Sequence, residues 1–183
     1  HTRYIGDWSS DVCSSDLDPA RPLRIYLAGP LFSEAERAWL DQVAARLRAE
    51  GHECFVPHEE TASLTEFTSR LIYALDGDGL RSANVLVAWL DGLAVDDGTA
   101  CEVGIFAELV RSGGPQYRGI VGIVTDLRLQ RRRSVVPGDG LNLFVAGAIE
   151  ASGSICWSVD AARSEEHTSA LQSPMYLVCR LLL

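Results

Sequence analysis

One stretch of the sequence decides the fold: Val85-Leu86-Val87-Ala88-Trp89-Leu90, then Asp91-Gly92, then Asp96-Asp97-Gly98-Thr99-Ala100-Cys101-Glu102. The unbroken apolar run has the length of a buried strand, and the acidic and glycine-rich residues after it lead into a helical pattern. Strand, loop and helix in this order form the unit of a parallel α/β sheet. The carboxylates therefore lie at the carboxyl end of a strand, where open α/β sheets bind their ligands.

Glu102 has two possible roles in this pattern. With Thr99 as the N-cap, Glu102 is the third helical residue, beside free backbone N–H groups and the positive end of the helix dipole. A carboxylate there is expected to stay ionised and fixed, so it could act as a nucleophile. Thr99 and Glu102 also have the spacing of a capping box, in which the glutamate only satisfies a backbone N–H. The spacing alone leaves both roles open.

The rest of the chain continues the alternation of strands and helices. Further strands are predicted at Arg24–Ala28, Cys54–Val56, Gly119–Val124 and Ser154–Trp157. Helices are predicted from a capping box at Ser33 and Glu36 to Gly51, and at Thr65–Tyr73, Asp76–Ser82, Thr99–Arg111 and Leu141–Ala151. Loops are predicted at His58–Glu60 and at the basic segment Asp126–Pro137. With right-handed crossovers this order predicts a flavodoxin-like, doubly wound, five-stranded parallel sheet in a three-layer α/β/α fold, with strand order 2-1-3-4-5.

That strand order places a crevice between the first and third strands. Tyr26 and Gly29-Pro30 would then face Asp96 and Glu102 across it. No glycine-rich phosphate-binding motif follows the first strand, and the P-loop pattern is absent from the sequence. A crevice lined by carboxylates favours a neutral or cationic ligand over a polyphosphate.

The two ends of the chain look like translated sequencing adapter. Residues 163–179 can be back-translated so that their reverse complement encodes residues 1–17 with one mismatch, Ser10 opposite Ala170. Unrelated protein termini are not reverse complements of each other. We therefore expect adapter-derived tails at residues 1–17 and 163–183, and one domain, encoded by a metagenomic insert, at residues 18–162. A domain of this length can bury a full core.

Charge and cysteine content narrow the class of protein. The net charge is −9 and the chain has no lysine, which argues against binding to a nucleic acid polymer. No apolar run is long enough to span a membrane. Cys54, Cys101 and Cys156 lie between the tails without the paired spacing of a metal site, which predicts three reduced thiols in a cytoplasmic protein.

Several motifs occur together and in order along residues 18–162. They are Ile25-Tyr26-Leu27-Ala28-Gly29-Pro30-Leu31-Phe32, Asp76, Leu90-Asp91-Gly92, Asp96-Asp97-Gly98-Thr99-Ala100-Cys101-Glu102-Val103-Gly104 and Asn142-Leu143-Phe144. In this combination the sequence resembles the nucleoside 2-deoxyribosyltransferase family. The resemblance implies transfer of a 2-deoxyribosyl group between nucleobases, and a role in nucleotide salvage.

The resemblance also implies roles for individual residues. Glu102 matches the nucleophile that attacks C1′ of the sugar, and Tyr26 matches the tyrosine that orients this carboxylate. Asp76 and Asp96 match the acids that contact the leaving base and protonate it. Asn142 matches a residue near the sugar or the glutamate that is sometimes reached across a subunit interface, so a homo-oligomer is expected.

Further substrate contacts are implied for Gly29, Pro30, Phe32, Asp91, Gly98 and Thr99. The expected partners are a nucleoside and a free nucleobase, with no metal and no cofactor. Asp97 departs from the family pattern, which usually has a small residue there. Its added charge is expected to raise the proton affinity of its neighbours.

Two other functions are open to this sequence. A hydrolase of the same fold that cleaves deoxynucleoside 5′-monophosphates would need a phosphate cradle after the first strand, and Gly29-Pro30-Leu31-Phe32 offers neither a hydroxyl nor a cation. A non-catalytic nucleotide-binding or response-regulator-like module is the other. There Asp91 would be the phospho-acceptor and would need a lysine partner, which this chain does not contain.

Overall fold

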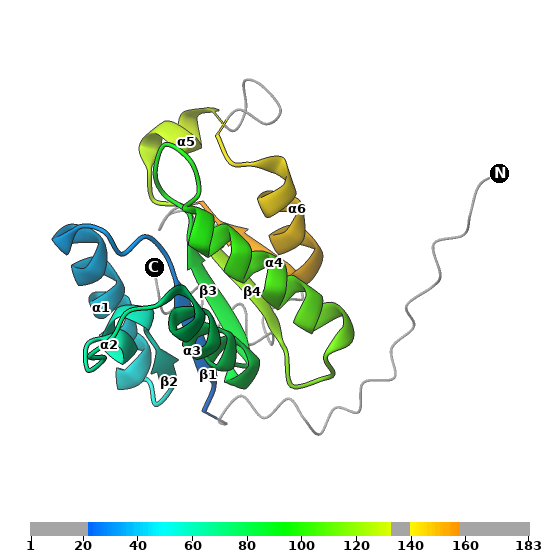
Figure 1. Ribbon diagram of the computed structural model, residues 1–183. Helices are drawn as coiled ribbons and strands as arrows, with labels where there is room; N and C mark the ends of the chain where they lie inside the picture. The colour runs from blue at the N-terminus through cyan, green and yellow to red at the C-terminus, as the bar shows by residue number, and fades with distance from the viewer. Residues whose placement is uncertain (1–21, 133–139, 158–183) are drawn as a thin grey trace.

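The computed structural model of the protein describes residues 22–132 and 140–157. Within these residues one parallel sheet is formed in the order β2-β1-β3-β4-β5, as predicted (Figure 1). The strands are β1 Arg24–Ala28, β2 Glu53–Phe55, β3 Val85–Trp89, β4 Gly119–Ile123 and β5 Gly153–Cys156. The predicted tails at residues 1–17 and 163–183 lie outside the described residues.

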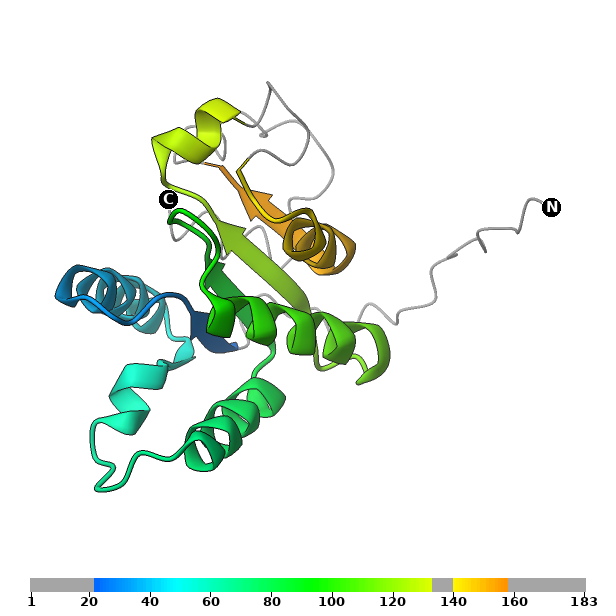
Figure 2. The same cartoon turned by 45° about the horizontal axis from the view of Figure 1, so that its top comes forward.

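Helices cover both faces of this sheet (Figure 2). They are α1 Glu34–Ala49, α2 Pro57–Thr61, α3 Ser69–Ser82, α4 Asp97–Ser112, α5 Leu127–Arg132 and α6 Leu143–Ser152. Apolar residues of α1 form one core with one face of the sheet, and those of α3, α4 and α6 form a second core with the other. The three-layer arrangement expected from the sequence is therefore confirmed.

The central strand β3 supplies side chains to both cores. Val85 and Val87 face α1, whereas Leu86 and Ala88 face α3 and α4, because alternate residues of a strand point to opposite faces. Tyr26 of β1 pairs with Leu86 and lies in the same core. This register directs the Tyr26 side chain toward the layer that contains α4.

On the α1 face, two indole rings pack against each other at the end of β3. Trp39 of α1 and Trp89 of β3 stack with ring centroids 4.3 Å apart and an angle of 22° between the ring planes. The helix that brings Trp39 there begins with the predicted capping box. The Glu36 amide donates to Ser33 Oγ at 3.2 Å, and the Ser33 amide donates to Glu36 Oε2 at 2.6 Å.

Two predicted loops are wrong in part. His58–Glu60 belong to the short helix α2, which begins at Pro57, because proline suits the first helical position, where its missing N–H leaves no bond unmade. The segment after Asp126 begins with α5 rather than with an extended loop, and Leu129 anchors this helix in the core. The remainder of that predicted loop, residues 133–139, lies outside the described residues.

The predicted break in the helix before β3 is also wrong. Residues Ser69–Ser82 form one continuous helix, α3, capped by the Thr68 side chain, which accepts from the Leu71 amide. Gly77 and Gly79 lie inside it, although glycine weakens a helix by about 1 kcal/mol relative to alanine. Gly79 has a packing reason, because a Cβ there would lie 2.7 Å from two carbons of the Phe55 ring.

The described cysteines are not all reduced. Cys54 and Cys101 are free, and Cys101 is exposed. Cys156 is disulfide-bonded, so the prediction of three reduced thiols is wrong for that residue.

A chain limited to residues 18–162 is expected to keep this fold, because it contains every strand and helix described above. Its thermal midpoint should lie within a few degrees of that of the full chain. A reducing agent in both samples prevents the disulfide of Cys156 from contributing to the comparison. A loss of more than about 10 °C would show that the tails stabilise the domain.

Candidate active site

A buried tyrosine in the middle of β1 meets a glutamate of α4. The Tyr26 hydroxyl donates a hydrogen bond of 2.5 Å to Glu102 Oε1, and the Tyr26 side chain is fully buried. Burial, followed by the negative charge of Glu102, raises the pKa of Tyr26. Tyr26 therefore stays protonated and fixes the Glu102 carboxyl group in one orientation.

The start of α4 differs from the sequence prediction. Asp96, not Thr99, is the N-cap: its Oδ2 accepts from the Thr99 amide at 3.0 Å and from the Thr99 hydroxyl at 3.1 Å. Because α4 begins at Asp97, Glu102 lies in the second turn and Thr99 in the first. The capping-box role of Glu102 is therefore wrong, and the hydrogen bond between Glu102 and Tyr26 does not cap the helix.

The prediction that Glu102 stays ionised is also wrong for the free protein. Its pKa is raised to about 8, chiefly because burial disfavours the charged carboxylate. The hydrogen bond from Tyr26 lowers the pKa, and the negative charges of Asp76 and Asp96 raise it further. Burial therefore favours the protonated form of Glu102 over the carboxylate.

Asp76 of α3 is one of the two acids whose charges act on Glu102. Its side chain is half-buried, and burial raises its pKa. Its Oδ1 atom is buried, and within residues 22–132 and 140–157 no donor or acceptor reaches that atom. A protonated carboxyl group with no internal partner can serve as a hydrogen-bond donor to a bound molecule.

These pKa shifts predict how stability depends on pH. A glutamate in the unfolded chain loses its proton near pH 4.5, whereas folded Glu102 keeps its proton up to about pH 8. Between these values the folded state binds more protons, so the contribution of Glu102 to stability falls as the pH rises. We expect the difference in thermal midpoint between E102Q and the wild type to shift in favour of E102Q as the pH rises from about 5 to about 8.5. Thermal melts at both values test this, and a difference that does not change with pH would contradict it.

Two residues predicted to contact the substrate, Asp91 and Asn142, accept hydrogen bonds from other groups of this chain. Asp91 bridges the ends of β3 and β4: its Oδ1 accepts from the amides of Thr125 and Asp126 at 2.7 and 3.0 Å, and its Oδ2 accepts from the Thr125 hydroxyl. Asn142 is the N-cap of α6 and accepts from the Phe144 amide at 2.9 Å. Neither side chain contacts Glu102 in this arrangement, although Asn142 remains exposed.

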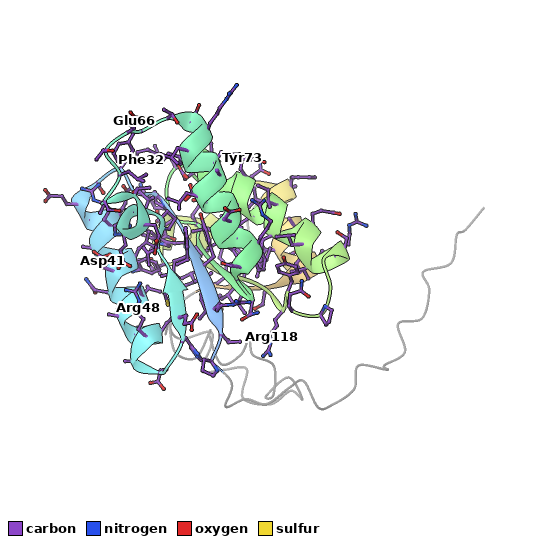
Figure 3. All side chains as sticks on the ribbon, turned by 60° about the horizontal axis from the view of Figure 1, so that its bottom comes forward. Phe32, Asp41, Arg48, Glu66, Tyr73 and Arg118 are labelled. Carbon is purple, nitrogen blue, oxygen red and sulfur yellow. The ribbon has the colours of Figure 1, made fainter. Side chains whose placement is uncertain are left out.

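The other predicted contacts lie in the loop after β1 and in the first turn of α4. Gly29 and Pro30 are half-buried directly after β1, and Phe32 is 81% exposed. Phe32 lies at the same end of the molecule as the loop that contains Glu66, whereas Arg118 lies at the opposite end (Figure 3). Gly98 is exposed in the first turn of α4, where its amide donates to Asp97 Oδ1 at 2.8 Å. The charge of Asp97 is thus partly satisfied by the backbone of its own helix.

Sequence reasoning did not single out Phe55, which packs directly on the site. The rings of Phe55 and Tyr26 stack with centroids 4.9 Å apart and an angle of 13° between their planes. The two residues are also register partners in β2 and β1. Knowledge of the register would have revealed the contact, because paired residues of neighbouring strands share a face of the sheet.

Within the part of the chain that the structure describes, no group of three or more histidine, cysteine, aspartate or glutamate residues is arranged to hold a metal ion. Among the described helices, none combines the length and apolar character required to cross a membrane.

Comparisons with known proteins place this geometry in context. Three solved structures share the fold at low identity. A conserved protein from Enterococcus faecalis V583 has a TM-score of 0.61 and 23% identity, with 79% of this chain and 97% of that chain covered. A 2-deoxyribosyltransferase from Bacillus psychrosaccharolyticus has a TM-score of 0.53 and 18% identity, with coverage of 81% and 95%. A 2-desoxiribosyltransferase from Leishmania mexicana has a TM-score of 0.51 and 22% identity, with coverage of 80% and 100%.

The search of curated protein sequences gave no match. The family model described as nucleoside 2-deoxyribosyltransferase matches residues 25–128, which is more than half of the chain. The matched region contains Tyr26, Asp76 and Glu102. The chain therefore belongs to the nucleoside 2-deoxyribosyltransferase family.

Proposed function

We propose that this protein transfers a 2-deoxyribosyl group from one nucleobase to another through a covalent ester on Glu102. Family membership supports action on the N-glycosidic bond of nucleosides. The observation that most supports the finer proposal is the hydrogen bond from the buried Tyr26 hydroxyl to Glu102, with Asp76 close enough for its charge to affect Glu102. A fixed carboxylate beside a protonated acid is the pair that a retaining glycosyl transfer requires.

In the first half of the proposed reaction, the Glu102 carboxylate attacks C1′ of the nucleoside. The bond from C1′ to the base nitrogen breaks, and the departing base takes the proton of Asp76 or Asp96. Asp76 is the better candidate for the proton donor, because Asp96 already accepts two hydrogen bonds from Thr99. Glu102 must lose its own proton before it attacks, so the rate should rise with pH toward the pKa of about 8.

In the second half, a free base attacks C1′ from the face that the first base left. Its N–H proton passes to the aspartate that protonated the first base, and the ester bond to Glu102 breaks. Two displacements at C1′ retain the configuration of the sugar. Glu102 and the aspartate end in their starting protonation states, so the cycle needs no cofactor.

The loop after β1 also favours a nucleoside over a 5′-monophosphate. Arg37 of α1 donates from Nη1 to the carbonyl oxygen of Leu31 at 2.6 Å. Its guanidinium group therefore holds this loop in place, and residues 29–32 of the loop carry neither a hydroxyl nor a cationic side chain that could bind a phosphate. We propose that substrates enter without a 5′-phosphate, that the protein serves nucleotide salvage in the cytoplasm, and that a second copy of the chain supplies Asn142 to complete the site.

Incubation of the protein with one 2′-deoxynucleoside and a second free base tests the transfer. We expect the new deoxynucleoside to form faster than free deoxyribose is released. Chromatography of matched mixtures with and without the second base measures both rates, and E102Q serves as the inactive control.

A deoxynucleoside 5′-monophosphate in the same assay tests the hydrolase alternative. Cleavage of that substrate to free base and sugar phosphate, at a rate that an added base does not change, would replace the transferase proposal with the hydrolase.

A further inference from the structure

Phe55 connects three elements around the candidate site. Its ring lies flat against the Tyr26 ring, at 4.9 Å and 13°. The ring also lies close to the backbone of α3, because a Cβ at Gly79 would lie within 2.8 Å of three atoms of the Phe55 ring. Strand β2, strand β1 and helix α3 therefore meet at this one side chain.

Each element that Phe55 contacts also supplies a group to the site. Strand β1 supplies Tyr26, and α3 supplies Asp76 one turn before Gly79. A larger residue than glycine at position 79 would separate α3 from Phe55, and with it Asp76 from Glu102. Gly79 therefore permits a close approach between α3 and Phe55, although helix propensity opposes a glycine at that position.

We propose that Phe55 is a positioning residue, which holds the Tyr26 hydroxyl on Glu102 and sets the distance from α3 to β1. Phe55 touches no reacting atom and acts through Tyr26 and Gly79. This inference deepens the proposed function and rests on the assignment of Glu102 as nucleophile.

The geometry explains why a flat ring is needed at this position. Tyr26 is fully buried, so its hydroxyl can move away from Glu102 only if the ring tilts or slides. A stacked ring at van der Waals distance opposes both motions. A branched aliphatic side chain would fill similar space but would leave the tilt of the tyrosine ring less restricted.

The principal test is F55L, with W39L as the matched control. Trp39 also stacks on a residue of the sheet, but its partner Trp89 packs on the face of the sheet that α1 covers, opposite to Tyr26. We expect F55L to lower kcat by about 10- to 100-fold with KM within about twofold, because small misplacement of catalytic groups has effects of that size. W39L should lower the thermal midpoint at least as much, while its kcat stays within about twofold of the wild type.

A second readout distinguishes positioning from general loss of stability. Carbon-13 NMR of labelled glutamate, with E102Q used to assign the signal, follows the titration of Glu102 directly. Tyr26, Asp76 and Asp96 are the groups whose charges or hydrogen bonds act on it. Because the hydrogen bond from Tyr26 lowers the pKa of Glu102, F55L should move that titration to higher pH and W39L should leave it in place.

A double-mutant cycle tests whether Phe55 acts through Tyr26. In a Y26F background the hydroxyl is gone, so adding F55L should lower kcat by a smaller factor than it does in the wild type, and the remaining loss reports the contact with α3. An equal loss from F55L in both backgrounds, or an unchanged Glu102 titration in F55L, would overturn the proposal.

The variant G79A gives an independent route if F55L does not fold. Alanine favours a helix by about 1 kcal/mol over glycine, so helix propensity does not predict unfolding. The new methyl group should displace the Phe55 ring, lower kcat and raise the pH at which Glu102 titrates. Wild-type values of both would count against the proposal. If the wild type cleaves no N-glycosidic bond, the proposed function fails, while the NMR titration needs no substrate and still decides the positioning role.

Discussion

E102Q is expected to lower kcat by about 10³-fold or more while the fold persists, because an amide cannot form the ester with C1′. Loss of a helix cap is the main way in which this substitution could unfold the protein, and Glu102 is not a cap in this structure. Asp96 caps α4, and Glu102 lies in the second turn of the helix. A neutral side chain of the same shape also suits a buried site in which the glutamate itself holds a proton up to about pH 8.

Two measurements check this first prediction. Steady-state rates give the loss in kcat, and intact mass spectrometry during turnover should show a deoxyribosyl adduct on the wild type that E102Q lacks. The matched control is E108Q on the same helix, where an exposed carboxylate pairs with Arg111 at 2.6 Å. We expect E108Q to keep kcat within about twofold, since exposed ion pairs contribute little to stability. A near wild-type rate for E102Q would exclude Glu102 as the nucleophile.

D76N should produce the second large effect, a loss of about 10²- to 10⁴-fold in kcat, because general acid catalysis contributes rate factors of that size. Asparagine keeps the shape and can still donate a hydrogen bond, but it cannot transfer a proton to the departing base. The raised pKa of Asp76 and its buried Oδ1 atom fit a group that delivers a proton to a ligand.

The size of this loss should depend on the base. A nucleoside whose base leaves easily as an anion needs less help from an acid, so D76N should impair it least. D78N, two residues further along α3, is the control, because Asp78 is exposed and pairs with Arg81 at 2.7 Å. Equal losses for good and poor leaving groups would indicate that Asp76 binds the base without protonating it.

The sheet could be predicted because its signals are local. The apolar run at Val85–Leu90 and the glycines and prolines that end the strands determine where strands begin and end. The strand order then follows from the handedness of the crossovers, and the structure has the predicted order. The meeting of Tyr26 with Glu102 follows in turn, because β1 lies beside β3, and the helix α4 that follows β3 packs on the face of the sheet to which Tyr26 points.

The details of the site depend on contacts that the sequence does not specify. Asp96 and Thr99 are both good N-cap residues, so the start of α4 could be placed three residues too late. The glycines of α3 predicted a break in the helix. The local sequence does not reveal the reason for Gly79, because the Phe55 ring that packs there comes from a distant strand. The proton affinity of Glu102 depends on its burial, and this effect outweighs the helix terminus considered from spacing alone.

The stacked pair of Trp39 and Trp89 gives an optical signal for one half of this molecule. Two indoles at 4.3 Å couple their electronic transitions, so the pair should produce a paired positive and negative band in the near-ultraviolet circular dichroism spectrum. That band depends on the contact between α1 and the end of β3, on the face of the sheet opposite Glu102. Loss of the band while turnover continues would mean that α1 can separate from the sheet without disturbing the catalytic layer.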